Sequence, residues 1–88
     1  MNIDKNASVV DVRTPSEYAG EHYHGAFNIP LNELPNRIEE CKALPKPIIA
    51  YCRTGSRSRT AVALLKQNGI SEAVNGGGLA DMLQSIHY

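Results

Sequence analysis

The residues best suited to chemistry in this sequence surround one of its two cysteines, Cys52. Three arginines follow it within seven residues, at Arg53, Arg57 and Arg59, and Gly55 lies between them. A short loop with a glycine can turn successive backbone N–H groups toward one point, and a helix starting near Arg57 adds its positive dipole end. Such surroundings lower a cysteine pKa from about 8.5 to roughly 3.5–7.5. The pattern predicts that Cys52 is a thiolate nucleophile.

A structural interpretation of Cys52 stands beside the reactive one. A cysteine at the end of an apolar strand is often a buried apolar residue without chemistry. That interpretation leaves the following arginines unexplained, so we favour the reactive one. Ser56 and Ser58 are expected to donate hydroxyl hydrogen bonds to a bound anion, to cap the helix that follows, or to do both.

Short strands alternating with helices must hold this loop. Apolar, β-branched runs predict strands over 8–12, 26–29, 48–52 and 73–75. Helical spacing and capping residues predict helices from 14 to about 20, near 33–42, from about 57 to 69 and over 79–86, with a turn at 76–78. This order predicts an α/β fold with a mostly parallel sheet of four to five strands and helices on both faces. Reactive sites of such sheets lie beyond the carboxyl ends of the strands, where Cys52 stands.

The helix expected after the first strand has a strong start signal. Thr14 suits the N-cap, Pro15 suits the first helical position, and Glu17 stands at the capping-box offset. Further along, Cys41 falls on the apolar face of the helix expected near 33–42. A cysteine on such a face is more typical of a core residue than of a second, redox-active thiol.

Other polar residues near the strand ends favour structural roles. Asp11, in an otherwise apolar strand, is expected to be a hydrogen-bonded structural carboxylate. Arg13 and Glu17 are expected to pair across the first helical turn as scaffolding at the rim of the site. His22 and His24 lie two residues apart, but no third ligand supports a metal, so we interpret them as solvated loop residues.

Composition and charge narrow the function classes. The 88 residues are 42% hydrophobic and 20% charged with zero net charge, which is typical of one globular domain, here 1–88. Residues 41–71 contain six cations and no acid, which predicts a local anion-attracting patch rather than a nucleic-acid surface. The longest apolar runs, at five residues, are too short for a membrane span. The start lacks a secretory signal, so we expect a cytoplasmic protein, or a periplasmic one if a leader has been removed.

Four segments, in order, resemble the rhodanese family, and the resemblance runs from Val9 to about Met82. The segments are Asp11-Val12-Arg13 with Glu17-Tyr18, then His24 to Pro30, Cys52 to Arg57, and Asn75 to Gly78. Four pieces with sensible spacing form a specific signal, although each alone is weak.

The resemblance implies a rhodanese-type fold and a sulfurtransferase. Cys52 would accept a sulfane sulfur from a small anionic donor, thiosulfate or a related persulfide, and pass it to cyanide or a thiol in a ping-pong cycle. We expect no metal and no cofactor. The substrate-binding residues would be Arg53, Thr54, Gly55, Ser56, Arg57 and Ser58.

One departure from the family pattern concerns the N-terminal side. Family members usually have a strand and a helix before the Asp-Val-Arg strand, whereas ten residues precede Asp11 here. We therefore expect a sheet that is shortened at its N-terminus, in a monomer or a weak homodimer that covers the exposed edge. The sequence is most similar to small stand-alone rhodaneses, including the phage-shock-protein type.

Two other functions remain open at this stage. Cysteine phosphatases and arsenate reductases place five residues between cysteine and arginine, whereas four separate Cys52 from Arg57 and six separate it from Arg59. A non-catalytic rhodanese-like binding module is the other alternative, although inactive members typically lack the cysteine. A thiosulfate:cyanide assay with Cys52→Ala as control separates these functions.

Overall fold

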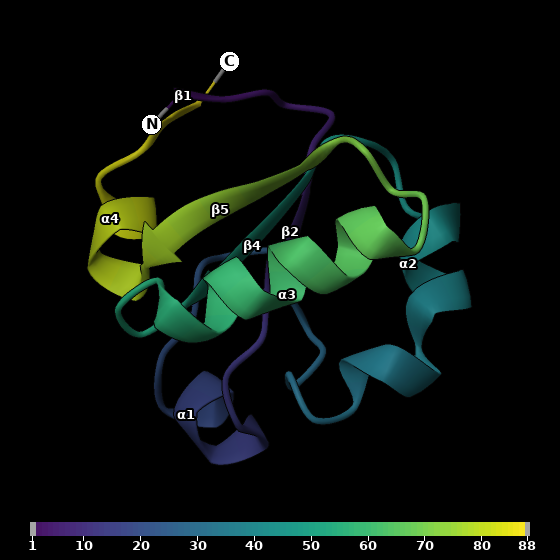
Figure 1. Cartoon of the computed structure of the whole chain (residues 1–88). Coiled ribbons are helices and arrows are strands. Elements are labelled where there is room, and N and C mark those ends of the chain that lie inside the picture. The colour runs from purple at the N-terminus through teal and green to yellow at the C-terminus, as the bar shows by residue number, and fades with distance from the viewer. Residues whose placement is uncertain (1, 88) are drawn as a thin grey trace.

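The central sheet of the computed structural model, which describes residues 2–87, has four parallel strands. They are β2 (Ser8–Asp11), β3 (Phe27–Asn28), β4 (Ile48–Cys52) and β5 (Ala73–Gly78). Their order across the sheet is β3-β2-β4-β5, so that β2 and β4 lie in the middle (Figure 1). Every residue of these two strands is buried, which explains why neither alternates polar with apolar residues.

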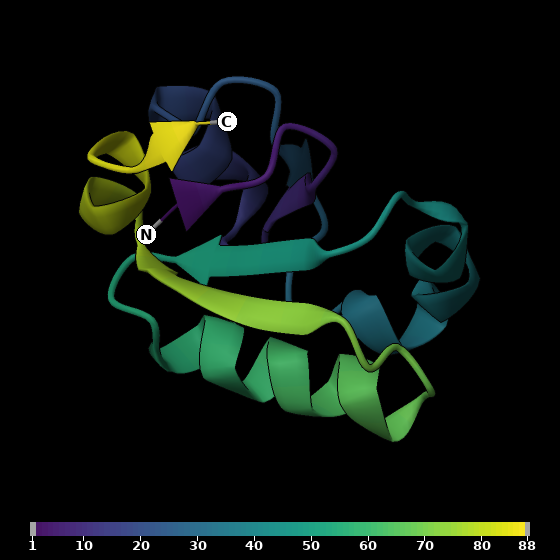
Figure 2. The same cartoon turned by 90° about the horizontal axis from the view of Figure 1, so that it is seen from above.

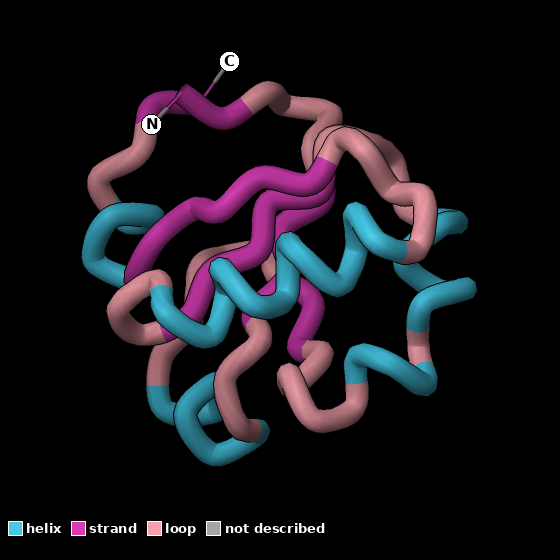
Figure 3. The backbone as a smooth tube through the Cα atoms, viewed as in Figure 1, coloured by secondary structure: helices cyan, strands magenta, loops and turns pink. Residues whose placement is uncertain are grey.

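Helices cover both faces of the sheet. They are α1 (Pro15–Gly20), α2 (Ile38–Ala43), α3 (Ser56–Gln67) and α4 (Leu79–Leu83), with a short 3₁₀ helix, η1 (Leu34–Asn36), before α2. Figure 2 shows α2 and α3 on one face of the sheet and α1 and α4 on the other. Figure 3 shows the same alternation of strands and helices along the chain. The predicted mostly parallel α/β architecture is therefore confirmed.

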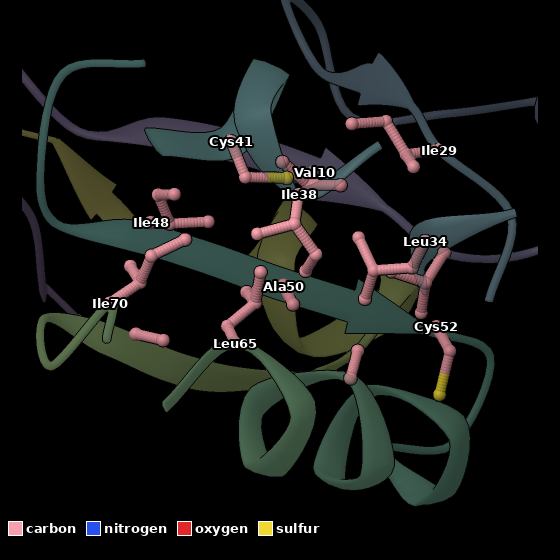
Figure 4. Close-up of a cluster of buried hydrophobic side chains, with 13 residues drawn as sticks. Val10, Ile29, Leu34, Ile38, Cys41, Ile48, Ala50, Cys52, Leu65 and Ile70 are labelled. Atoms are coloured by element: carbon pink, nitrogen blue, oxygen red, sulfur yellow. The ribbon is translucent and has the colours of Figure 1, made fainter. Parts of the chain in front are cut away.

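The larger apolar core lies between the sheet and the helices α2 and α3 (Figure 4). Val10 and Ala50 from the two central strands pack there against Ile38 of α2 and Leu65 of α3. A smaller core on the other face of the sheet includes fully buried Met82 of α4. Successive side chains of β4 enter the two cores alternately, so this strand anchors both layers of helices.

The prediction of one continuous helix near 33–42 is wrong. The chain forms η1, leaves helical angles at Arg37 (φ −125°, ψ 21°) and then forms α2. The hydrogen bonds of η1 span three residues, so its turn is tighter than an α-helical one. A 3₁₀ turn followed by an α-helix still buries Leu34, Ile38 and Cys41, so residue spacing alone does not detect the break.

The turn predicted at 76–78 is also wrong, because these glycines belong to β5. The register of β5 against β4 shifts between Ala50 and Tyr51, which leaves Gly76 as a bulge. A Cβ at Gly76 would lie 2.6 Å from Met82 Sδ. Consecutive glycines therefore let a strand pass beneath α4 at a distance that side chains would prevent.

The last helix ends at Leu83, earlier than the predicted residue 86. The chain then forms β6 (Ile86–His87), which pairs in parallel with β1 (Asn2–Ile3) and brings the two ends of the chain together (Figure 1). Between β1 and β2, within the described range 2–87, there is no helix.

Candidate active site

Cys52 lies at the carboxyl end of β4, where the chain turns into α3. Its side chain is 1% exposed and points toward the first turn of α3 (Figure 4). Its sulfur accepts hydrogen bonds from the backbone N–H groups of Gly55 at 3.0 Å and Ser58 at 3.4 Å. The Ser58 hydroxyl lies 3.5 Å from the same sulfur. Hydrogen-bonding groups of the loop and of the first turn of α3 thus point toward Cys52 Sγ.

These contacts set the acidity of the thiol. Burial alone raises the pKa of Cys52, because it removes the water that would solvate the anion. Hydrogen bonds from the side chain and backbone of Ser58, and from the backbones of Thr54 and Gly55, outweigh burial and hold the pKa below its ordinary value. The geometry therefore favours a thiolate at this position.

Gly55 makes the tight turn of the loop possible. It is the N-cap of α3 and has a left-handed backbone, with φ at 96°. A side chain would be strained in this conformation, and its Cβ would also lie 3.3 Å from Gly77 Cα in β5. The expectation that Gly55 supplies backbone angles for a tight curl is confirmed.

Asn75 of β5 braces the loop from the neighbouring strand. Its amide Nδ2 donates to the Gly55 carbonyl at 3.0 Å. Its Oδ1 accepts from the Ser58 hydroxyl at 2.6 Å and from the Gly77 N–H at 2.9 Å. Sequence reasoning missed this role. The available signal was a polar residue at the carboxyl end of the strand expected over 73–75, directly before the three glycines.

Arg57 forms an ion pair with Glu17 of α1. Two guanidinium nitrogens contact the two carboxylate oxygens at 2.8 and 3.0 Å. The hydrogen bond from Arg57, with a further backbone bond from Thr14, lowers the pKa of Glu17 to about 2. The Arg57 guanidinium at the rim of the site is therefore held in a fixed position by a partner on another element.

The expected pairing of Arg13 with Glu17 is wrong. Arg13 instead pairs with Asp11, at 2.6 Å, and its guanidinium also donates to the Glu21 carbonyl at 2.6 Å. The Tyr51 hydroxyl donates to Asp11 as well, at 2.7 Å. Because Asp11 is fully buried, an anion there needs these donors, and it attracts the nearby arginine. The prediction that Asp11 is a hydrogen-bonded structural carboxylate is confirmed.

The remaining loop residues line two depressions on either side of the loop. One of them is lined by Thr54, Ser56 and Arg59, together with Gly55 and Asn75. Arg53 lines the other, which extends toward α1 and α4. The structure thus gathers the predicted residues 52–58 at one end of the sheet, with Cys52 and Ser58 buried beneath the more exposed members.

The other residues considered from the sequence lie outside this loop. Cys41 is fully buried in the larger core, at the opposite end of that cluster from Cys52, as Figure 4 shows. Its placement in the core is confirmed, and burial raises the pKa of its thiol. His24 is exposed, whereas His22 is not simply solvated, because its ring stacks on Tyr18 with centroids 3.7 Å apart.

Residues 2–87 contain neither a metal-ligand cluster nor a membrane-spanning helix. No group of three or more histidine, cysteine and carboxylate side chains in that range is arranged to hold a metal ion. No helix among the same residues is long and apolar enough to span a bilayer.

Comparison with known proteins places this geometry in a family. The model of the rhodanese-like domain matches residues 1–83. Thiosulfate sulfurtransferase PspE of Escherichia coli (strain K12) is 40% identical over 76 residues, which cover 83% of this chain and 71% of PspE. The uncharacterized protein YqhL of Bacillus subtilis (strain 168) is 41% identical over 71 residues. That match covers 81% of this chain but only 56% of YqhL, so the chain spans little more than half of that relative.

Solved structures agree with these sequence matches. A rhodanese with anions from E. coli superposes with a TM-score of 0.78 at 37% identity, covering 85% of this chain and 89% of that one. The human single-domain sulfurtransferase TSTD1 has a TM-score of 0.75 at 27% identity, with 90% of this chain and 82% of that chain covered. The sequence, the parallel sheet and the loop around its cysteine thus agree, and the chain belongs to the rhodanese-like domain family.

Proposed function

We propose that this protein is a sulfurtransferase that carries a sulfane sulfur as a persulfide on Cys52. The observation that carries the proposal is the convergence of the Gly55 and Ser58 N–H groups on Cys52 Sγ, at 3.0 and 3.4 Å. Fixed donors of this kind stabilise negative charge on sulfur, whether in a thiolate or in a persulfide. Relatives named as sulfurtransferases, including PspE, support the same activity.

The first half-reaction loads the cysteine. The Cys52 thiolate attacks the outer sulfur of thiosulfate, and a new S–S bond forms on Cys52. The S–S bond of thiosulfate breaks, and sulfite leaves with the electron pair. The exposed Arg53 is the cation that we assign to the incoming anion, because Arg57 is already paired with Glu17.

The second half-reaction returns the enzyme to its thiolate form. Cyanide or a thiolate attacks the terminal sulfur of the persulfide, and the bond between that sulfur and Cys52 Sγ breaks. The acceptor leaves as thiocyanate or as a new persulfide, and Cys52 regains its electron pair. The same N–H groups stabilise the anion on Cys52 at both ends of the cycle.

The test is thiosulfate:cyanide activity of the wild type and of Cys52→Ser. We expect the variant to lose all sulfur transfer while its circular dichroism and thermal unfolding stay unchanged, because serine is nearly isosteric. After thiosulfate treatment, mass spectrometry should find one added sulfur on Cys52 and none on Cys41.

Other outcomes separate the alternatives. Full activity in Cys52→Ser would remove the persulfide mechanism. Phosphatase activity without sulfur transfer would favour the cysteine phosphatase alternative, and no turnover with any sulfur donor would favour a non-catalytic binding module.

A further inference from the structure

A groove beside the Cys52 loop carries two opposite charges that have no partner among residues 2–87. Its wall includes Arg53 from the loop, Glu21 from the end of α1, and Leu79 and Leu83 from α4. Among residues 2–87, no hydrogen bond or ion pair engages the Arg53 guanidinium or the Glu21 carboxylate, and the two do not contact each other. Both charges are therefore available to a ligand.

The other two charged side chains of the groove are already neutralised. Arg13 is paired with Asp11, and Glu17 is paired with Arg57. Arg13 also donates to the Glu21 carbonyl at 2.6 Å, which fixes the backbone that bears the free carboxylate. The charge pattern that a ligand meets is thus one cation and one anion, each at a defined place.

The wall of the same groove also contains apolar side chains. Leu79 is half-buried, Leu83 is 53% exposed, and both lie on α4 in the wall of the groove. The groove adjoins the reactive loop because Arg53 directly follows Cys52. Gly78, at the start of α4, packs so closely on the Arg53 carbonyl that a Cβ would not fit. In Figure 1, the loop after β4 lies between α4 and α1.

We propose that this groove binds the sulfur acceptor, and that the acceptor is a small zwitterionic thiol. Its carboxylate faces Arg53, its ammonium group faces Glu21, and its short carbon chain lies along Leu79 and Leu83. The inference rests on the proposed function, which supplies the persulfide. The acceptor thiolate bonds to the terminal sulfur, the bond from that sulfur to Cys52 breaks, and Cys52 leaves as a thiolate. The acceptor's thiol proton goes to solvent, and no further oxidant or reductant is needed.

Glu21 is the residue that distinguishes an acceptor groove from a donor groove. Thiosulfate carries only negative charge, so a free carboxylate repels it and does not help it bind. An ammonium group on the thiol gives that carboxylate a partner. The arrangement of Arg53 with Glu21 therefore fits a ligand with both charges better than it fits the anionic donor.

The test isolates the second half-reaction in a single turnover. The protein is loaded with thiosulfate, excess donor is removed, and the loss of the added sulfur is followed by mass spectrometry after addition of one thiol. The thiols are cysteine with both charges, cysteamine with the ammonium alone, and 3-mercaptopropionate with the carboxylate alone. Rates of a variant are divided by the wild-type rate for the same thiol, so that differences in thiol reactivity cancel.

We expect each variant to change the transfer rate only for thiols that carry the charge opposite to the one removed. Glu21→Gln should slow transfer to cysteine and cysteamine by up to about fivefold, the upper end for an exposed ion pair, and should leave 3-mercaptopropionate unchanged. Arg53→Gln should slow cysteine and 3-mercaptopropionate by about the same factor and leave cysteamine unchanged. Loading by thiosulfate should not fall in Glu21→Gln.

Matched controls change the same charges far from the groove. Glu72→Gln and Lys66→Gln alter exposed residues and should leave all three rates unchanged. The groove assignment is overturned if Glu21→Gln affects the three thiols equally, or if the remote variants reproduce its pattern. If loading is normal but transfer does not depend on the charges of the thiol, only the groove assignment is overturned. If the wild type never acquires sulfur, both the proposed function and the groove assignment are contradicted.

Discussion

At the scale of single residues, the site depends on hydrogen-bond donors whose positions are set by other groups. The Ser58 hydroxyl has one proton, which it donates to Asn75 Oδ1 at 2.6 Å, while its oxygen lies 3.5 Å from Cys52 Sγ. A turn of the hydroxyl toward the sulfur provides a further donor when Cys52 is charged. The backbone N–H of Ser58 contacts the sulfur in either case.

The lowered pKa of Cys52 predicts the pH dependence of its reactivity. The folded pKa lies below the ordinary value, so alkylation by iodoacetamide should rise with pH around a midpoint that is lower than the midpoint of a free cysteine thiol. In Ser58→Ala the thiolate loses the hydroxyl donor but keeps the backbone N–H, so the midpoint should move to higher pH. Peptide mapping by mass spectrometry separates Cys52 from the buried Cys41. An unchanged midpoint in Ser58→Ala would exclude a role for the hydroxyl.

At the scale of elements, the junction of β5 with α4 depends on glycines, which have no side chain. The bulge at Gly76 lets β5 run beneath α4, and the Gly78 N–H then donates to Asp81 at 2.8 Å, which closes the first turn of the helix. Since α4 carries part of the groove beside the loop, this junction positions functional surface as well as the core.

The substitution Gly76→Ala tests that junction. The new Cβ would lie 2.6 Å from Met82 Sδ and 2.9 Å from Ile49 Cγ2, so both must shift. We expect the free energy of unfolding to fall by about 1–3 kcal/mol, as in other overpacked cores. Gly20→Ala is the matched control, because no atom beyond its chain neighbours and its own helix backbone lies within 4 Å of its Cβ position, and it should not lower the free energy of unfolding. Equal stability of the two variants in urea denaturation would contradict this account.

At the scale of the whole molecule, one ion pair joins elements from opposite faces of the sheet. Glu17 belongs to α1 and Arg57 to α3, and the pair closes over the carboxyl end of the strands. Glu17 also accepts from the Thr14 backbone N–H at 3.0 Å in a capping box, so this side chain both starts its own helix and contacts another.

The pKa of Glu17 gives the direction of its effect on stability. The folded value of about 2 is below the ordinary 4.5, so the stabilisation is complete above pH 4.5 and is lost as pH falls toward 2. Glu17→Gln keeps a capping-box side chain but removes the charge. Because the pair is partly exposed, we expect this variant to be less stable than the wild type by up to about 1 kcal/mol at pH 6. The difference should narrow at pH 2.5 in urea denaturation, and an equal difference at both pH values would rule the ion pair out as its source.

The sequence by itself determined the features that depend on near neighbours. The capping box of Thr14 and Glu17 spans three residues, and the strand ending at Cys52 is a continuous apolar run, so both follow from local spacing. The need for a glycine at residue 55 also follows from the chain nearby, since a curl between strand and helix demands a left-handed residue. The cysteine, its loop and the alternating α/β order were therefore predictable.

Only the tertiary structure decided which distant groups meet at the loop. Glu17 pairs with Arg57, 40 residues away, and the Ser58 hydroxyl reaches Asn75, 17 residues away. The placement of Arg53 and Glu21 in one groove is of the same kind. The adjacency of β2, β4 and β5 brings the carboxyl ends of strands that are far apart in sequence to one edge of the sheet. Residue spacing along the chain does not predict those contacts, because they depend on which strands pair and in which register.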